Sequence, residues 1–376
     1  MDSKRGFMLV VSISAMVFLT MLGYTSLSRT ANEGRLSRWS MAMYRSMALA
    51  EASVDRSFAK LHVGDFTNLS TTTWGDGTYW AEVTPAGGPL EFLVTAHGRY
   101  ASAPTDLEVL ARLQQTSVFQ FALFGSNQVT IGGTVETDSY DATDGLYDAS
   151  TAGDNGDVGT NAVTAGGVVI DGSLTMEGQL AVGPDVADPD SVVTISGGSY
   201  SISADPPIVS QSATMPMPDI TVPGGLVCNN ATLNGGAPTV LSSAVGVYCF
   251  HNLKLNGGAT LTSDGPVQVY VTGQFYAGGN TLIGVPEMPK NFLMYVTSDQ
   301  QATIEGTITG TSEFHGGLYA PNTTISIGGN AKVFGSVIAE NVEVPGDAEI
   351  HYDESLGTLI EPPGFYRVKQ ISWREL

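Results

Sequence analysis

Charged side chains, cysteine and long apolar runs are all scarce in this sequence of 376 residues. Only 14% of the residues are charged, against about 25% in typical soluble domains, which excludes a highly charged disordered chain or a coiled coil. The 16 Lys and Arg face 37 Asp and Glu, a net charge of −21. Because phosphate contacts need clustered basic side chains, this balance argues against a nucleic-acid partner. The 42% of hydrophobic residues can still form a core.

Sequence signatures of catalysis and metal binding are also missing. There is no GxSxG, HExxH, GxxxxGK(S/T), GxGxxG or CxxC motif. The five histidines are scattered, as is typical of ordinary surface or core histidines. Carboxylates gather between residues 138 and 157, where Asp154 and Asp157 are weak candidates for Ca²⁺ ligands. The alternative is a solvated glycine-rich loop. We expect no cofactor, no metal site and no enzymatic activity.

The N-terminus holds the one long apolar run. Phe7–Leu27 has no charge over 21 residues, which as a helix would span roughly 30 Å, the thickness of a bilayer core. Residues 1–6 form a basic leader with Lys4 and Arg5. We expect a single-pass inner-membrane helix. The alternative, a cleaved secretory signal peptide, requires a shorter apolar stretch followed by a small-x-small site.

The same helix is predicted to continue to residue 61. Beyond the apolar run, apolar residues recur at spacings of three and four, which is one stripe of an α-helix. The stripe comprises Leu36, Trp39, Met43, Met47, Ala50, Val54, Phe58 and Leu61. Residues 7–61 therefore read as a single helix, apolar first and amphipathic later, whose stripe needs a covering layer.

The start of this helix resembles the class III signal of type IV pilins. The resemblance rests on Lys-Arg-Gly followed by Phe-Met-Leu-Val, and residues 50–61 are similar to PilX-type minor pilins. It implies cleavage between Gly6 and Phe7 by a prepilin peptidase, N-methylation of Phe7 and packing with other pilin subunits. Val11 departs from the pattern, since pilins carry Glu as the fifth mature residue. We interpret Val11 as the sign of a non-repeating position such as a filament tip.

Residues 62–118 are predicted to form a small antiparallel β unit. Three stretches alternate apolar and polar residues, at 78–83, 91–96 and 106–113, and a Pro-Ala-Gly-Gly-Pro turn separates the first two. A small sheet of this kind would supply the layer that covers the helix stripe, and it is similar to the head of a PilX-type pilin.

Residues 119–357 change to short β-rich runs separated by Gly-Gly. The segments ATLNGGA at 231–237 and LKLNGGA at 253–259 repeat after 22 residues. Such a period with glycine corners indicates a right-handed parallel β-helix. The alternative is a β-sandwich, whose turns usually recur every 8–12 residues. Residues 358–376 are predicted to form a C-terminal tail.

The two cysteines fit the repeat. Cys228 and Cys249 are 21 residues apart, so they would lie on neighbouring coils at a separation suited to a disulfide. An exported domain with two cysteines favours a structural disulfide over redox chemistry. Two buried free thiols are the alternative.

Several segments of the repeat region resemble an uncharacterised β-helical domain that follows PilX-type N-termini. They are residues 139–147, 316–330, 333–339 and 346–356, and the final coils look similar to bactofilins. This resemblance implies architecture and setting but no ligand.

Together these features predict an α+β membrane-anchored chain: a long N-terminal helix on a small antiparallel sheet, followed by a right-handed parallel β-helix. The predicted function is that of a structural minor pilin-like component of a type IV pilus or related filament, at the tip, displaying the β-helix for adhesion to a surface or glycan. Its partners would be pilin subunits, the assembly machinery and the inner membrane, before an extracellular filament or cell surface. A membrane-anchored carbohydrate-active β-helix enzyme and an adhesin with an uncleaved anchor are the alternatives.

Overall fold

The computed structural model describes residues 3–376, except 63, 89, 298–304 and 360–363. The chain divides into two compact units, each described here by itself. The helix–sheet unit comprises Met1–Gln114 and Tyr366–Leu376, and the repeat unit comprises Gln115–Phe365. Most of the described residues with regular structure are in β-strands, and the single α-helix among them is α1 (Ser3–His62).

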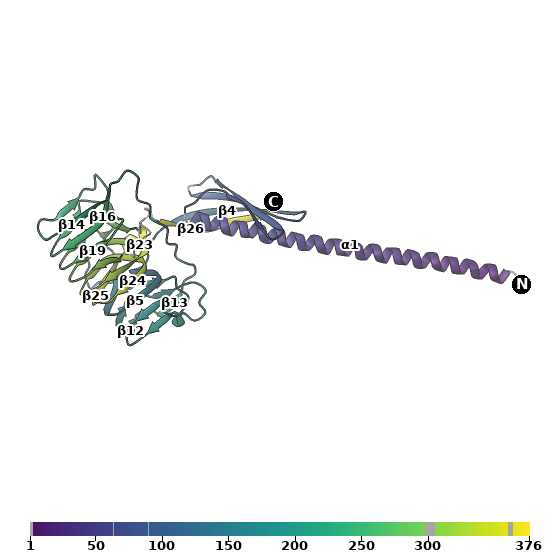
Figure 1. The fold of residues 1–376 in the computed structure, drawn as a ribbon. Helices are drawn as coiled ribbons and strands as arrows, with labels where there is room; N and C mark the ends of the chain where they lie inside the picture. Colours follow the sequence, from purple (N-terminus) through teal and green to yellow (C-terminus); the bar gives the residue numbers. More distant parts are fainter. Residues whose placement is uncertain (1–2, 63, 89, 298–304, 360–363) are drawn as a thin grey trace. The chain divides into compact units, whose positions relative to one another are not determined.

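The helix–sheet unit packs the C-terminal part of α1 on a five-stranded sheet (Figure 1). The sheet order is β1 (Leu69–Trp74), β2 (Gly77–Pro85), β3 (Glu91–Tyr100), β4 (Ala103–Ser117) and β26 (Gly364–Glu375), with β1 to β4 antiparallel. Ala50, Val54 and Leu61 are buried against Ala81, Val94 and Ala96 in one apolar cluster. The segment predicted as a C-terminal tail thus supplies an edge strand of this sheet.

A glycine lets the helix approach the sheet closely. The Cβ that another residue would carry at Gly98 would lie 2.0 Å from the carbonyl oxygen of Ser46 and 2.6 Å from the amide nitrogen of Ala50. The side chain of Ser46 is buried at the same contact, where its hydroxyl is 2.6 Å from that of Thr105. The backbones of α1 and β3 therefore meet with no side chain between them.

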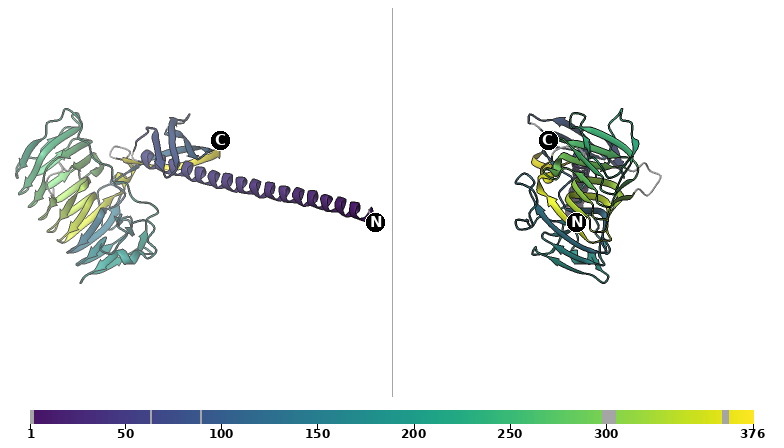
Figure 2. Two further views of the ribbon diagram at one scale, coloured as in Figure 1. Left: turned by 45° about the vertical axis from the view of Figure 1, so that its right-hand side comes forward. Right: turned by 90° about the vertical axis from the view of Figure 1, so that its left-hand side faces the viewer.

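The repeat unit is built from parallel strands stacked as successive layers (Figure 2). Its first strands are β5 (Leu123–Ile131), β6 (Thr134–Tyr140), β7 (Val158–Thr160), β8 (Val168–Ile170), β9 (Ser173–Met176), β10 (Leu180–Val182), β11 (Val193–Ile195), β12 (Ser199–Ile202) and β13 (Ile208–Ser210). The next are β14 (Asn229–Leu233), β15 (Thr239–Leu241), β16 (Val247–Asn256), β17 (Thr260–Ser263), β18 (Val267–Val271), β19 (Phe275–Gly278) and β20 (Leu282–Gly284). The last are β21 (Phe292–Val296), β22 (Glu305–Ile308), β23 (Glu313–Ile327), β24 (Lys332–Val344) and β25 (Ala348–Asp353), with short 3₁₀ turns at Pro189–Val192, Pro289–Asn291 and Glu354–Thr358.

The layers of the repeat unit do not follow the order of the chain. One column of parallel strands runs β13, β10, β7, β5, β24, β23, β21, β18, β16, β14. The chain therefore enters in the middle at β5, winds outward to β13, continues at the far end with β14, and winds back. Its last strands β24 and β25 pair with its first, β5 and β6, so the last layer of the chain lies against the first.

Inward-facing residues of successive layers form the core of this unit. Ile283, Phe314, Val333 and Ile350 are in register on four neighbouring strands, and all are fully buried. Glycines make the corners: a Cβ at Gly329, whose φ is +66°, would lie 2.6 Å from the amide nitrogen of Gly310 in the layer below. Stacked glycine corners allow the layers to approach to the spacing of a sheet.

Two predictions from the sequence are corrected by the structure. The predicted fold class, a membrane-anchored α+β chain with a right-handed β-helix, is wrong in that form, because the chain is mostly β with a single helix and its parallel strands close on the first layer. Among the described residues, no helix is both long and apolar enough to span a membrane. Among the described side chains the uncharged apolar run comprises only residues 13–27, which is shorter than a bilayer crossing requires. This finding overturns the predicted transmembrane segment and the single-pass inner-membrane location.

Candidate functional site

Aromatic and imidazole rings stack along one outer face of the repeat unit. His315, Phe334 and His351 occupy the same register on β23, β24 and β25, and Asp138 on β6 follows them. The rings of His315 and Phe334 are stacked 4.4 Å apart, and those of Phe334 and His351 lie 4.9 Å apart. We call His315, Phe334, His351 and Asp138 the ring ladder.

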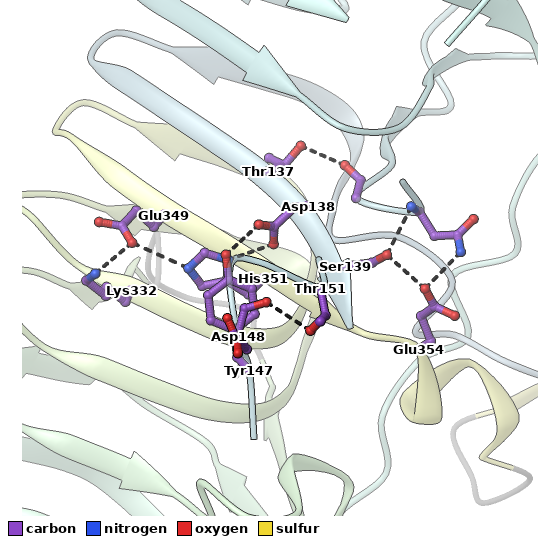
Figure 3. A network of polar contacts seen from close by, with 12 residues as sticks. Thr137, Asp138, Ser139, Tyr147, Asp148, Thr151, Lys332, Glu349, His351 and Glu354 are labelled. Carbon is purple, nitrogen blue, oxygen red and sulfur yellow. Dashed lines mark hydrogen bonds and ion pairs between the residues drawn. The ribbon is translucent and has the colours of Figure 1, made fainter. Parts of the chain in front are cut away.

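The ring ladder is covered by the segment that follows β6. The ring of Tyr147 stacks on His351 with centroids 3.8 Å apart, and its hydroxyl donates to Oδ2 of Asp138 at 2.6 Å. Asp138 Oδ1 also lies 2.7 Å from Nδ1 of His351 (Figure 3). The side chains of His315 and His351 are 7% and 5% exposed, so this outward face is closed to water at the histidines.

A second row of side chains runs beside the ring ladder, two residues earlier on each strand. Glu313, Lys332, Glu349 and Glu136 are in register on β23, β24, β25 and β6, and we call them the charged ladder. Lys332 Nζ is 2.6 Å from Oε2 of Glu349 (Figure 3). Glu313 and Glu349 also face the histidines, at 3.3 Å from His315 Nε2 and 3.4 Å from His351 Nε2.

The charged ladder lines a polar groove of about 580 Å³. The opposite wall comes from the residues that follow the corner glycines on each layer. The groove is lined by Thr134, Glu136, Asn280, Thr311, Glu313, Asn330, Ala331, Lys332, Asp347, Ala348 and Glu349. The groove has a net negative charge, because its lining contains four carboxylates and one ammonium group, that of Lys332. Amide and hydroxyl side chains recur along the groove on successive layers.

Burial and pairing set the protonation of these groups. Burial lowers the pKa of His315, against the opposing effect of Glu313. Burial raises the pKa of Tyr147, and its hydrogen bond to Asp138 adds to this. For Glu349, burial would raise the pKa, but the pairing with Lys332 and His351 outweighs it and the pKa is lowered. Glu349 is thus held ionised, which suits contact with a cation and not the protonated state that a general acid needs.

The buried carboxyls with raised pKa lie in structural positions. Burial raises the pKa of Asp157, which accepts a hydrogen bond from the amide of Gln179 at 2.7 Å. Burial also raises the pKa of Asp353, which accepts from the amides of Ala142 and Ser355. Both carboxyls hold backbone segments of the repeat unit in place.

The Ca²⁺ candidates do not form a ligand set. Asp154 is exposed, whereas Asp157 is directed to the backbone of Gln179. Within the residues that the structure describes, no group of three or more His, Cys, Asp or Glu is placed to hold a metal ion.

The cysteines lie on adjacent layers. A disulfide joins Cys228 to Cys249, with their Cα atoms 4.7 Å apart. The pairing of Asn229 with Phe250 on β14 and β16 sets this separation. The bond fastens the outermost layer, at β14, to the layer beneath it.

The predicted assembly helix is divided by the sheet. Met47, Val54 and Phe58 pack into the apolar cluster of the helix–sheet unit. Leu36 and Trp39 are 64% and 59% exposed, and Met43 is half-buried. The stripe therefore continues beyond the sheet that covers it. The backbone of Gly6, Phe7 and Val11 lies in α1, and their side chains lie outside the described residues.

Sequence reasoning missed both ladders. It treated His315 and His351 as scattered, although they are 36 residues apart, which is two layers of the repeat. Aligning the sequence on its glycine corners would have placed these two histidines with Phe334 in one column.

Comparisons with known proteins give a family match over part of the chain and similar solved structures. Residues 242–359 match a family described as a domain of unknown function (DUF7305). No curated protein matches the chain. A pilin is among the similar solved structures: the crystal structure of the competence-associated pilin ComZ from Thermus thermophilus, with a TM-score of 0.26 and 10% identity, covers 89% of this chain and 97% of its own. A TM-score this low does not establish a shared fold.

Proposed function

We propose that this chain is a structural, non-enzymatic, minor pilin-like component of a type IV pilus or related filament, and that its repeat unit is displayed for adhesion. The observation that carries the proposal is the division of α1. Its C-terminal part is buried on the sheet, whereas the part before it exposes large apolar side chains. These include Ile13, Met16, Val17, Phe18, Leu19, Met21, Leu22, Leu27, Leu36 and Trp39, each at least half exposed.

Such a surface is costly in water and needs a partner. Large contiguous apolar patches on soluble proteins mark interaction sites, and helices associate through an exposed apolar face. Packing α1 beside other pilin subunits would bury these side chains. The proposed order of events is cleavage between Gly6 and Phe7 by a prepilin peptidase, N-methylation of Phe7, and insertion of the helix into the filament.

We also propose that the chain lies at the tip of the filament. Val11 supplies no carboxylate to pair with the amino terminus of a neighbouring subunit, and an unpaired buried charge is costly. A subunit at the end of the filament needs fewer such contacts than one in the shaft.

The polar groove is the proposed adhesion surface of the repeat unit. Its amides, hydroxyls and carboxylates recur on successive layers, so an extended glycan would meet the same groups repeatedly and gain affinity from many weak contacts. The ionised state of Glu349 supports binding in preference to turnover.

Mass spectrometry of the mature N-terminus in sheared surface fractions tests the proposal. We expect a peptide that begins at N-methylated Phe7. Gly6→Val should abolish processing and remove the chain from that fraction, whereas the control Gly23→Val, where a side chain meets nothing within 4 Å, should be processed normally. An intact Met1 terminus in the sheared fraction would contradict the pilin-like role, and release of products from a glycan would contradict the non-enzymatic one.

A further inference from the structure

An exposed amphipathic patch lies on α1 before the sheet begins. Leu36 and Trp39 are neighbours one turn apart, and Arg35 and Arg38 flank them, also exposed. Among the described residues, neither guanidinium lies within ion-pair distance of a carboxylate. We call these four residues the arginine patch.

A groove of about 350 Å³ with complementary chemistry lies farther along the same unit. Its apolar part is formed by Val54 of α1 and by Leu107 and Val109 of β4. Glu51 and Asp55, one turn apart on α1, are exposed at its side, and the described residues offer them no ion pair. Gln370 and Trp373 of β26 complete the lining, and Trp373 is 55% exposed. We call this the acidic groove.

We propose that the arginine patch of one copy of this chain docks into the acidic groove of a second copy. The inference rests on the proposed filament role but not on the tip position, because the contact requires two adjacent copies in the filament; it adds the surface and register of that contact. Leu36 and Trp39 would cover Val54 and Trp373, while the two arginines meet the two carboxylates. Glu51 and Asp55 repel each other in the isolated chain, and two cations would relieve that repulsion.

The geometry of the helix makes the contact intermolecular. The patch and the groove are centred about 16 residues apart on α1, roughly 24 Å at 1.5 Å per residue, so one rigid helix cannot bring them together. The contact joins different surfaces on the two copies, and a heterologous contact of this kind can repeat along an assembly. The apolar side chains supply most of the attraction, and the charges set the register.

A second groove on the helix–sheet unit serves as a natural control. It is lined by Arg45, Ala48, Leu49, Ala52, Trp74, Gly75, Asp76 and Tyr100. It is more apolar than acidic, and Arg45 would repel the arginine patch. Charge therefore favours the acidic groove as the partner of the patch.

Cysteine cross-linking between two tagged full-length copies tests the inference. One copy carries Asn32→Cys, an exposed position one turn before Leu36, and the other carries Gln370→Cys in the acidic groove. We expect a mixed disulfide at least tenfold more abundant than with the control Asp76→Cys, which lies in the second groove. Equal yields at Gln370 and Asp76 would overturn the proposed register.

Charge reversal distinguishes the proposed contact from nonspecific association. Glu51→Arg with Asp55→Arg on the copy that carries Gln370→Cys should lower the cross-link about tenfold, and Arg35→Glu with Arg38→Glu on the other copy should restore it. No loss, or loss without restoration, would contradict the contact. The sheared surface fraction tests the filament role separately. If the chain is found in that fraction with Phe7 at its N-terminus but forms no cross-link, only the docking is refuted. If the chain forms the cross-link but is absent from that fraction, only the filament role is refuted.

Discussion

The two units of this chain use their apolar residues in different ways. In the repeat unit the residues that face inward on each layer are buried by the layers above and below, so Ile283, Phe314, Val333 and Ile350 are fully enclosed within one chain. In the helix–sheet unit a small sheet covers only part of a helix of 60 residues and leaves Leu36 exposed. The repeat unit completes its own core, whereas α1 presents a surface that another molecule can complete.

The largest expected effect comes from emptying the core of the repeat unit. Phe314→Ala removes a fully buried ring that lies edge-on to Phe292, with ring centroids 6.4 Å apart, and it should lower the free energy of unfolding by about 3–5 kcal/mol. Leu36→Ala on exposed α1 should change it by less than about 0.5 kcal/mol. Chemical denaturation monitored by hydrogen exchange in each unit measures both. Similar losses at the two positions would refute the contrast between the units.

The next largest effect should occur where the helix meets the sheet. In Gly98→Ala the new methyl group would lie 2.0 Å from the Ser46 carbonyl oxygen, so the helix must shift, at a cost of about 1–3 kcal/mol. Gly34→Ala is the matched control, because a methyl group there meets nothing within 4 Å and alanine favours a helix by up to about 1 kcal/mol. Hydrogen exchange in β3 should rise for Gly98→Ala alone. Unchanged exchange would mean that the close approach is unimportant for the unit.

Acid should weaken the repeat unit around His315 before it weakens the helix–sheet unit around Asp106. The pKa of His315 is lowered by burial, so folding keeps this group neutral. Its contribution is fully present above the unfolded value of about 6.5 and is lost as the pH falls toward the lowered folded pKa. In the helix–sheet unit, burial opposes ionisation of Asp106, but Arg99 and His97 lower its pKa overall. That contribution is lost only below about 3.9.

Stability between pH 7 and pH 5 distinguishes the two cases. Exchange in β23 and β24 should accelerate as the pH falls, after correction for the intrinsic rate, while exchange in β3 should not. His315→Phe should remove most of this dependence, since a phenylalanine can keep the stack on Phe334 without titrating. An unaltered pH dependence in His315→Phe would contradict the assignment of the effect to His315.

Local patterns in the sequence predicted individual elements better than their order in space. The spacing of Met47, Val54 and Phe58 placed them on one helix face, and the structure packs them against the sheet. The same spacing at Leu36 and Trp39 carries no information about where the sheet ends, and the structure leaves these two residues of the stripe exposed. Periodicity reports which residues share a face but not what covers that face.

The pairing of the first and last layers could not be read from the repeat. A period near 20 residues indicates that neighbouring segments stack, and this predicts layers in chain order. The contact between β24 and β5 joins segments more than 200 residues apart, and nothing in either strand marks it. The ladders depend on the same long-range pairing, because Asp138 and Glu136 reach their columns only when β6 pairs with β25.

The smallest expected effect is that of the exposed ion pairs, and it should be alike in the two units. Lys332 and Glu349 are 40% and 42% exposed, and in the helix–sheet unit Arg112, which is 58% exposed, pairs with Glu91, which is 17% exposed. Solvent and salt screen such pairs, so double-mutant cycles with Lys332→Met and Glu349→Gln, and with Arg112→Met and Glu91→Gln, should each give a coupling of about 0.2–1 kcal/mol that falls as salt increases. A much larger coupling at Lys332 would show that the charged ladder acts as a connected network with the buried histidines, and the two units would then differ in electrostatics as well as in packing.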